Sequence, residues 1–166
     1  ILFIDEIHRL SAVIEEFIYP AMEDFKVDFV VDKGAFAKVI NVPLKRFTMV
    51  GATTRAGMIS APLRDRFGLH YHIDFYPPAD LEEIIVRSAK LLDITIVREA
   101  AAVIASRSRG TPRIANRLLR RVRDYATVKS NGKMTVESAA ASLDAEGIDA
   151  AGLDQLDRKL LKIIIE

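Results

Sequence analysis

Two apolar runs in the first third of the chain have the length and composition of buried β-strands. The first covers residues 1–4 and is followed by Asp5-Glu6, and the second covers residues 47–53 and ends in small and hydroxyl side chains. Continuous apolar runs of this kind are typical of strands covered on both faces of a parallel sheet. Ligands bind at the carboxyl ends of such strands, so the residues at both ends are candidates for chemistry.

Between the two runs, the hydrophobic pattern is first helical and then strand-like. Residues 12–24 place apolar side chains near helical spacing, with Pro20 as a disturbance. Residues 26–32 and 36–42 are short β-type runs on either side of Lys33-Gly34, and this arrangement predicts a hairpin.

The double proline Pro77-Pro78 is the best candidate for a domain boundary. Before it, residues 63–67 predict a short helical turn, and the alternation over residues 71–76 predicts a strand. After it, strand signals fade and amphipathic helices dominate. We therefore expect three parts: the C-terminal part of an α/β domain over 1–76, a small all-α domain over 77–147, and a linker with the first helix of a third unit over 148–166.

Capping residues locate the helices of the second domain. Asp80, with Glu83 three residues later, has the pattern of a capping box for a helix that ends near Leu92. Gly110 stops a helix over 98–107, Thr111 caps the next one, and Pro112 fits its first position. That next helix is expected to bury Ile114, Leu118, Val122 and Tyr125, and a shorter helix follows Thr135.

Composition restricts the class of protein. Half of the 166 residues are apolar, 28% are charged and the net charge is +1, as in an ordinary soluble domain, and no apolar run reaches transmembrane length. The absence of cysteine excludes disulfides and favours a cytoplasmic setting. The chain begins without Met in the middle of a strand pattern, so we expect an internal fragment. Positive charge is local, since residues 107–123 carry seven arginines and no acid.

The strongest chemical candidate is the carboxylate pair Asp5-Glu6. An apolar strand that ends in Asp-Glu is the Walker B pattern of P-loop ATPases: the first carboxylate holds Mg²⁺, usually through water, and the second orients the attacking water. The alternative is a core strand that ends in solvated acids. Thr53 and Thr54, at the end of the second run, could sense the γ-phosphate, although a threonine pair also closes ordinary strands.

Arginines and one tyrosine give further candidates. Arg64 and Arg66 lie on a short turn, from which an arginine can reach the nucleotide of a neighbouring subunit; the alternative is a surface charge ladder. Arg113 in the first turn of a helix opposes the helix dipole, so a bound anion would account for it; the alternative is an arginine that faces solvent. Tyr76 could stack on an adenine or be an interdomain aromatic. His8 is expected to support the site or an interface, because a lone histidine is not a metal site.

The candidates follow one another along the chain in the order found in AAA+ ATPases. This order is the acid pair, the hydroxyl sensor, the exposed arginine, the domain boundary and the arginine at a helix start. Longer strings resemble the RuvB family, the bacterial motors of Holliday-junction branch migration. They cover residues 2–10, 19–25, 51–57, 61–68 and 110–124.

This resemblance implies a fold and a set of roles. The fold is the C-terminal part of an AAA+ P-loop ATPase core with a parallel sheet, then a helical lid and the start of a winged-helix domain. ATP and Mg²⁺ are the implied cofactors. The implied roles are Asp5 for the metal through water, Glu6 for the attacking water, Thr54 as sensor 1, Arg66 as a finger acting in trans, Arg113 as sensor 2, and Glu23, Asp24, Phe25 and Tyr76 near the nucleotide.

The resemblance also implies partners: double-stranded DNA at Holliday junctions, a RuvA-type protein that contacts the hairpin around Lys33-Gly34, and a hexameric ring of identical subunits. Asp32, Phe36 and Lys45-Arg46 depart from the family pattern in or beside the hairpin. No Gly-x-x-x-x-Gly-Lys-Ser/Thr motif occurs, so the phosphate loop is expected upstream and the fragment alone is expected to be inactive. Two alternatives remain: another AAA+ machine such as a clamp loader, and a non-catalytic AAA+ binding subunit.

Overall fold

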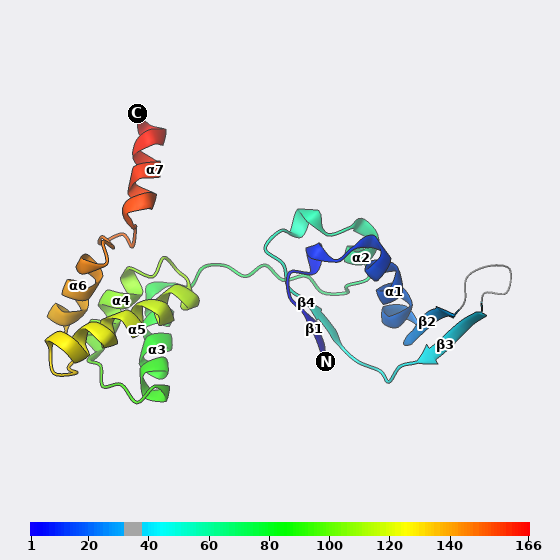
Figure 1. Cartoon of the computed structure of the whole chain (residues 1–166), viewed down its shortest axis with the longest axis horizontal. Helices are drawn as coiled ribbons and strands as arrows, with labels where there is room; N and C mark the ends of the chain where they lie inside the picture. Colours follow the sequence, from blue (N-terminus) through cyan, green and yellow to red (C-terminus); the bar gives the residue numbers. More distant parts are fainter. Residues whose placement is uncertain (32–37) are drawn as a thin grey trace. The chain divides into compact units, whose positions relative to one another are not determined.

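The computed structural model describes residues 1–31 and 38–166. The chain forms two compact units, Ile1–His72 and Ile73–Glu166 (Figure 1). The domain limits expected from the sequence, at residues 76 and 147, stay a prediction.

The first unit contains the two predicted buried strands. Strands β1 (Leu2–Ile4) and β4 (Met49–Gly51) pair in parallel, with Phe3 opposite Val50. The parallel pairing confirms the predicted sheet type. The prediction that β1 is covered on both faces is wrong for the described residues, because Leu2 is 44% and Phe3 60% exposed. Two strands and one neighbouring helix are too few to cover both faces, and an open apolar hollow lined partly by Leu2, Phe17 and Met49 remains.

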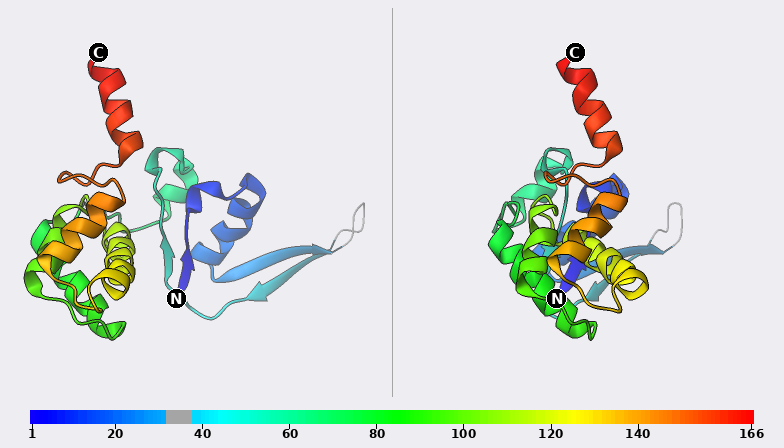
Figure 2. Two further views of the ribbon diagram at one scale, coloured as in Figure 1. Left: turned by 60° about the vertical axis from the view of Figure 1, so that its left-hand side comes forward. Right: turned by 90° about the vertical axis from the view of Figure 1, so that its left-hand side faces the viewer.

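Helix α1 (Ala12–Glu23) and a two-stranded ribbon follow β1 in the first unit. The helix confirms the sequence prediction and accommodates Pro20 within it. Strands β2 (Lys26–Val31) and β3 (Lys38–Pro43) pair antiparallel, and Figures 1 and 2 show them side by side as a ribbon that leaves the end of α1. The hairpin is thus confirmed, while its tip at Asp32, Lys33-Gly34 and Phe36 lies outside the described residues.

Short helices complete the first unit. The 3-10 helix η1 (Ile7–Arg9) follows β1, and η2 (Ala56–Met58) and α2 (Ala61–Asp65) follow β4. The strand predicted over residues 71–76 is wrong, because this segment has no regular secondary structure and Tyr71 and Ile73 are largely exposed. Alternating side chains make a strand only where a neighbouring strand supplies hydrogen bonds, and this segment pairs with no described strand.

The second unit contains five helices. They are α3 (Pro78–Leu91), α4 (Arg98–Ser106), α5 (Pro112–Lys129), α6 (Val136–Ala145) and α7 (Gln155–Ile165). Helices α3 to α6 pack together as a bundle, while α7 projects from it (Figure 1). The predicted N-cap at Asp80 is wrong. Pro77 takes that position and Pro78 fixes the first helical turn, so Asp80 lies inside the helix, where its charge still complements the dipole. The predicted cap at Thr135 is confirmed, and its hydroxyl accepts from the Ser138 amide.

Helices α3 to α6 enclose the core of the second unit. Leu81, Ile85, Ile104, Leu119 and Leu143 have no exposed surface. Of the side chains expected to be buried on α5, Leu118 and Val122 are buried, whereas Ile114 and Tyr125 are only partly covered. Among the described residues, no helix is long and apolar enough to cross a membrane.

Candidate functional site

A sharp corner between β1 and η1 presents the carboxylate pair. Glu6 adopts the left-handed conformation, with φ 49°. The Asp5 carboxylate accepts a hydrogen bond from the Glu6 amide at 2.9 Å, which supports this conformation. Ile7 is buried beneath the corner, and its amide donates to the Ala52 carbonyl at 2.9 Å. Gly51 leaves the necessary room, since a Cβ atom there would lie 2.8 Å from the Ile7 side chain.

The corner brings Glu6 against the residues that follow β4. The Thr54 hydroxyl donates to the Glu6 carboxylate at 3.1 Å, and the Thr54 amide donates at a longer 3.5 Å. The Nδ1 atom of His8 lies 3.2 Å from the same carboxylate and 2.7 Å from the Thr53 hydroxyl. Only 5% of the His8 side chain is exposed. The buried ring connects Glu6, after β1, to Thr53, after β4.

These neighbours set the ionisation of Glu6. Desolvation is the largest single influence and raises the pKa of Glu6, but the two hydrogen bonds from Thr54 and the charges of His8 and Arg9 together outweigh it. The pKa of Glu6 therefore lies below the ordinary value of a glutamate. The carboxylate is ionised at neutral pH, so it acts as a fixed hydrogen-bond acceptor.

Arg66, at the C-terminal end of α2, is held against α1. Its guanidinium carbon lies 4.2 Å from the centre of the Tyr19 ring, and its Nη1 atom donates to the Pro62 carbonyl at 2.7 Å. Its Nε atom lies 2.8 Å from the Glu23 carboxylate. The direction of that contact does not make it a hydrogen bond, so Nε is a buried donor without a hydrogen-bond partner among the described residues.

The segment Glu23-Asp24-Phe25 divides between different contacts. Glu23 pairs with Arg66, as described, while Asp24 pairs with Lys26 at 2.9 Å. Phe25 adopts a positive φ of 53° and packs edge-on against Phe47 at 5.9 Å. Of the three, Glu23 is thus the residue that the structure joins to another predicted site residue.

In the second unit, Tyr76 and Arg113 lie beside the same turn. The Tyr76 amide donates to the Gly110 carbonyl at 2.9 Å, three residues before Arg113. Thr111 takes the predicted N-cap position, but its hydroxyl bonds to the Arg109 carbonyl and does not cap the helix. The Arg113 side chain is exposed in the first turn of α5. It is therefore accessible to an anion.

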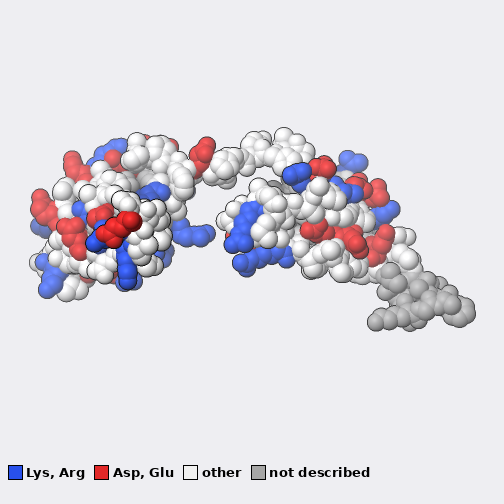
Figure 3. Space-filling view, turned by 90° about the horizontal axis from the view of Figure 1, so that it is seen from above, with Lys and Arg blue, Asp and Glu red and all other residues white. Residues whose placement is uncertain are grey.

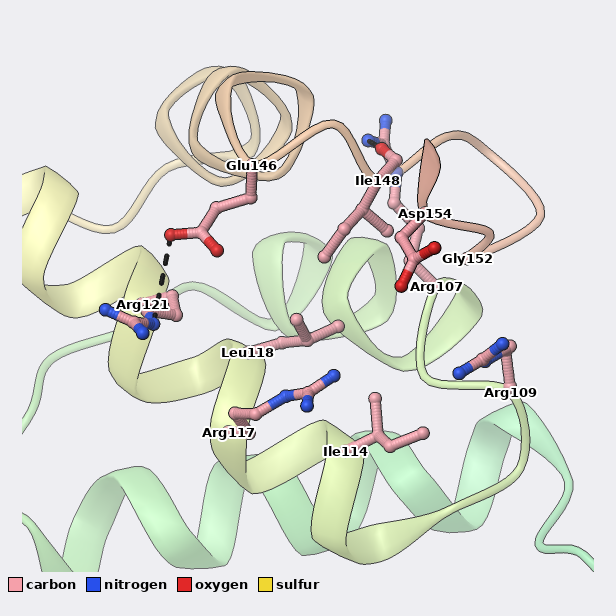
Figure 4. Close-up of a pocket in the computed structure, with 10 residues that line it drawn as sticks. All are labelled: Arg107, Arg109, Ile114, Arg117, Leu118, Arg121, Glu146, Ile148, Gly152 and Asp154. Carbon is pink, nitrogen blue, oxygen red and sulfur yellow. Dashed lines mark hydrogen bonds and ion pairs between the residues drawn. The ribbon is translucent and has the colours of Figure 1, made fainter. Parts of the chain in front are cut away.

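A small arginine-rich pocket lies behind this turn, in the second unit. Its volume is about 210 Å³, and Arg107, Arg109, Arg117 and Arg121 contribute to its lining. Figure 4 shows the Arg117 guanidinium beside Ile114 and Leu118, with Arg121 directed toward Glu146. Arg107 and Arg109 are paired with Asp144 and Asp157. Acidic and basic side chains also intermingle on the face of this unit in Figure 3, so the pocket is a partly neutralised surface.

A divalent ion would find one suitable ligand in the first unit. Asp5 is exposed at the end of β1 and keeps carboxylate lone pairs free besides its bond to the Glu6 amide. The described residues contain no group of three or more His, Cys, Asp or Glu side chains that could hold a metal. Mg²⁺ in nucleotide sites is held by one or two carboxylates together with phosphates and water, so Asp5 fits that kind of ion.

The structure thus joins some predicted site residues and not others. It brings Asp5, Glu6 and Thr54 together, and it brings Glu23 to Arg66. Sequence reasoning missed Tyr19 and Glu15, which support Arg66 from α1. The available signal was their spacing, since Glu15, Tyr19 and Glu23 recur every four residues and so share one face of the helix.

Comparison with known families divides the chain into two matched segments. Residues 1–73 match the model described as "Holliday junction DNA helicase RuvB P-loop domain". Residues 76–149 match the model described as "RuvB AAA lid domain".

Individual relatives match along nearly the whole chain. The Holliday junction branch migration complex subunit RuvB of Streptomyces coelicolor is 59% identical over 166 residues, which are 100% of this chain and 46% of the relative. The same subunit of Methanoregula boonei is 57% identical over 99% of this chain and 49% of the relative. The solved structure of the Thermotoga maritima RuvB Holliday junction branch migration motor is 47% identical, with a TM-score of 0.81 over 99% of this chain and 50% of that one. The chain spans about half the length of the curated relatives it matches.

Proposed function

The chain belongs to the RuvB family, and on this premise we propose that it is part of an ATP-driven motor that moves Holliday junctions along DNA. The observation that carries the proposal is the contact between Glu6 and Thr54, which unites the ends of β1 and β4 beside an exposed Asp5. Parallel strands that end in an acid pair and a hydroxyl are what phosphoryl transfer to water needs.

Each side chain of this cluster has one task. Glu6, ionised and fixed by Thr54, accepts a hydrogen bond from the attacking water and so aims its oxygen at the γ-phosphate. Asp5 would hold Mg²⁺, and the ion would supply neutralisation of phosphate charge. His8, beneath the corner, holds the Glu6 and Thr53 side chains in a fixed position relative to each other. Thr54 connects Glu6, which binds the water, to the end of β4. Loss of the γ-phosphate therefore changes the contacts at the end of this strand.

The remaining proposed contacts act on the nucleotide from other parts of the protein. Arg66 acts in trans on the nucleotide of a neighbouring subunit, and Arg113 acts on the phosphates in its own subunit. Glu23-Asp24-Phe25 and Tyr76 complete the nucleotide contacts. An arginine used in trans requires a ring, and we propose a hexamer in the cytoplasm that acts on double-stranded DNA with a RuvA-type partner. DNA contacts made to phosphates predict strong salt dependence.

The test uses a composite protein in which this chain replaces the matching half of Streptomyces coelicolor RuvB. Glu6→Gln keeps the shape of the side chain but weakens its hydrogen-bond acceptance. We expect nucleotide binding to be retained and ATP hydrolysis to fall at least 100-fold, since positioned groups of this kind contribute about 10²–10⁴-fold. Glu16→Gln, an exposed glutamate on α1, is the matched control and leaves both unchanged. Equal hydrolysis by the two variants contradicts the assignment of Glu6.

Arg66 is tested in the same composite against its neighbour. Arg66→Ala leaves nucleotide binding intact and lowers turnover about 10³-fold or more, the usual effect of losing an arginine finger. Arg64→Ala is the matched control, because Arg64 is exposed and only 3.9 Å from Asp65 in a surface pair. Normal turnover by Arg66→Ala rejects the proposed finger.

A further inference from the structure

Arg66 is not a free surface side chain, because α1 supports it on two sides. Tyr19 lies under the flat face of the guanidinium, with the ring centre 4.2 Å from Cζ, and Glu23 lies 2.8 Å from Nε. The third contact is the Pro62 carbonyl on Nη1. As a result only 27% of the side chain is exposed, although it ends a short helix at the surface.

The supporting ring is itself fixed. The Tyr19 hydroxyl donates to the Glu15 carboxylate at 2.8 Å, and the same carboxylate oxygen accepts a hydrogen bond from the Ser60 hydroxyl at 2.5 Å. Ser60 is the N-cap of α2, where its side chain accepts from the Leu63 amide. The Glu15 carboxylate on α1 therefore links Ser60, at the start of α2, to the Tyr19 ring. That ring in turn stacks on Arg66, at the end of α2.

This geometry leaves part of the guanidinium available for a ligand. Stacking occupies the face of the planar group, and Nη1 bonds to Pro62, so the remaining edge points away from these contacts. The Nε atom is buried without a hydrogen-bond partner in the described part of the chain, despite its closeness to Glu23. Because Nε is buried against Glu23, a phosphate oxygen can approach only the part of the guanidinium that lies outside the contacts with Tyr19, Glu23 and Pro62.

We propose that Tyr19 is a positioning residue for Arg66, and that Glu15 holds Tyr19 in place by tying it to the N-cap of α2. Tyr19 does not touch the nucleotide. It restricts the arginine to one plane, so that the free edge meets the neighbouring subunit's γ-phosphate already oriented. This inference rests on the proposed role of Arg66 and adds to it the residues that aim the guanidinium.

The consequence for catalysis follows from orientation. A guanidinium that loses its platform keeps its charge but samples many directions, and a misplacement of about 1 Å can cost about 100-fold in rate. Tyr19→Ala in the composite protein is expected to lower kcat by about 10-fold to 100-fold and to leave the KM for ATP unchanged. Tyr19→Phe keeps the ring and loses the bond to Glu15, so it falls between Tyr19→Ala and the unsubstituted protein. Glu16→Ala, at an exposed position of α1 outside the contacts described for Arg66 and Tyr19, retains normal turnover.

A subunit-mixing experiment separates a positioning role from a merely structural one. Tyr19→Ala subunits keep an intact hydrolytic site but supply a poorly aimed arginine, whereas Glu6→Gln subunits cannot hydrolyse ATP but supply a well-aimed one. Mixed rings are therefore expected to hydrolyse ATP faster than the sum of the two separate preparations. A mixture with no gain over that sum shows that Tyr19→Ala damages its own subunit, and it overturns the inference.

A second comparison keeps the two proposals distinguishable. The double variant Tyr19→Ala with Arg66→Ala is expected to be no slower than Arg66→Ala alone, because the platform matters only while the arginine is present. If Arg66→Ala is inactive but Tyr19→Ala turns over normally, the positioning role is rejected and the finger stands. If Arg66→Ala turns over normally, both are rejected. A further loss in the double variant also rejects the positioning role.

Discussion

Gly110 gives a test of how the start of α5, and with it Arg113, is held in place. Its φ is +71°, and a Cβ atom built on it would lie 2.6 Å from the Cβ of Phe75. Phe75 is 80% exposed, so its ring could turn away, but its Cβ moves only with the backbone. That backbone is fixed nearby, since the amide of Tyr76 donates to the carbonyl of Gly110 itself at 2.9 Å.

The size of the effect follows from two contributions. An alanine in the left-handed conformation costs about 1–2 kcal/mol relative to the right-handed one. Forcing an extra carbon into an occupied space typically costs about 1–3 kcal/mol more. Gly110→Ala is therefore expected to lower the free energy of unfolding of the second unit by about 2–5 kcal/mol.

Gly132 supplies a matched control in the same unit. Its φ is +76°, but nothing lies within 4 Å of a Cβ atom built there. Gly132→Ala thus carries the conformational penalty without the clash, and about 1 kcal/mol is expected. Urea unfolding of the chain, followed by helical circular dichroism, compares the two variants. With a slope of about 1.5 kcal/mol per molar urea, a difference of about 2 kcal/mol separates their midpoints by more than 1 M.

Equal midpoints for Gly110→Ala and Gly132→Ala would contradict this expectation, because they would leave no separate cost for the contact with Phe75. The same variant also bears on the site. If the clash moves the turn, Arg113 is displaced, and Gly110→Ala in the composite protein should weaken nucleotide binding more than Gly132→Ala does.

Three further predictions concern other parts of the molecule. Leu119→Ala, at a fully buried position of α5, should lower the unfolding free energy by about 3 kcal/mol, whereas Val128→Ala, at a position 77% exposed, should change it by less than about 0.5 kcal/mol in the same urea assay. Thr54→Val removes a hydrogen bond that lowers the pKa of Glu6, so the acid limb of the turnover profile should move to higher pH, while Thr54→Ser should leave it in place. The pKa of Asp154 is lowered, first by the Asp157 amide, so its stabilisation of the start of α7 is complete at neutral pH and is lost as the pH falls through its folded-state pKa; Asp154→Asn should reduce this acid sensitivity, measured as the pH dependence of the unfolding midpoint.

Local patterns were sufficient for most of the fold. The apolar runs identified β1 and β4, because a parallel strand leaves a continuous signal, and the capping residue Thr135 identified the start of α6. The failures share a cause. The alternation over residues 71–76 carries no information about whether a neighbouring strand exists, and Asp80 looked like a cap until Pro78 started the helix earlier.

The candidate site was predictable only in part, for the same physical reason. Asp5, Glu6 and Thr54 belong to strand ends, and parallel pairing alone brings such ends together. The support of Arg66 by Tyr19 depends on how α1 packs near α2, and no sequence spacing between residues 47 positions apart encodes that contact. Side-chain platforms of this kind become visible only in three dimensions.

The left-handed backbone at Glu6 makes the corner between β1 and η1 less stable, while the Glu6 side chain is needed there for activity. Glycine and asparagine adopt such a conformation with less strain than glutamate. The backbone at position 6 is therefore more strained with glutamate than it would be with either of these residues. Glu6→Gly is therefore expected to be one of the few substitutions that relieves the corner while it removes the group that orients the water. Selection for thermal resistance alone would favour such a substitution, so the residue found at this position indicates whether a laboratory-evolved variant has kept its function.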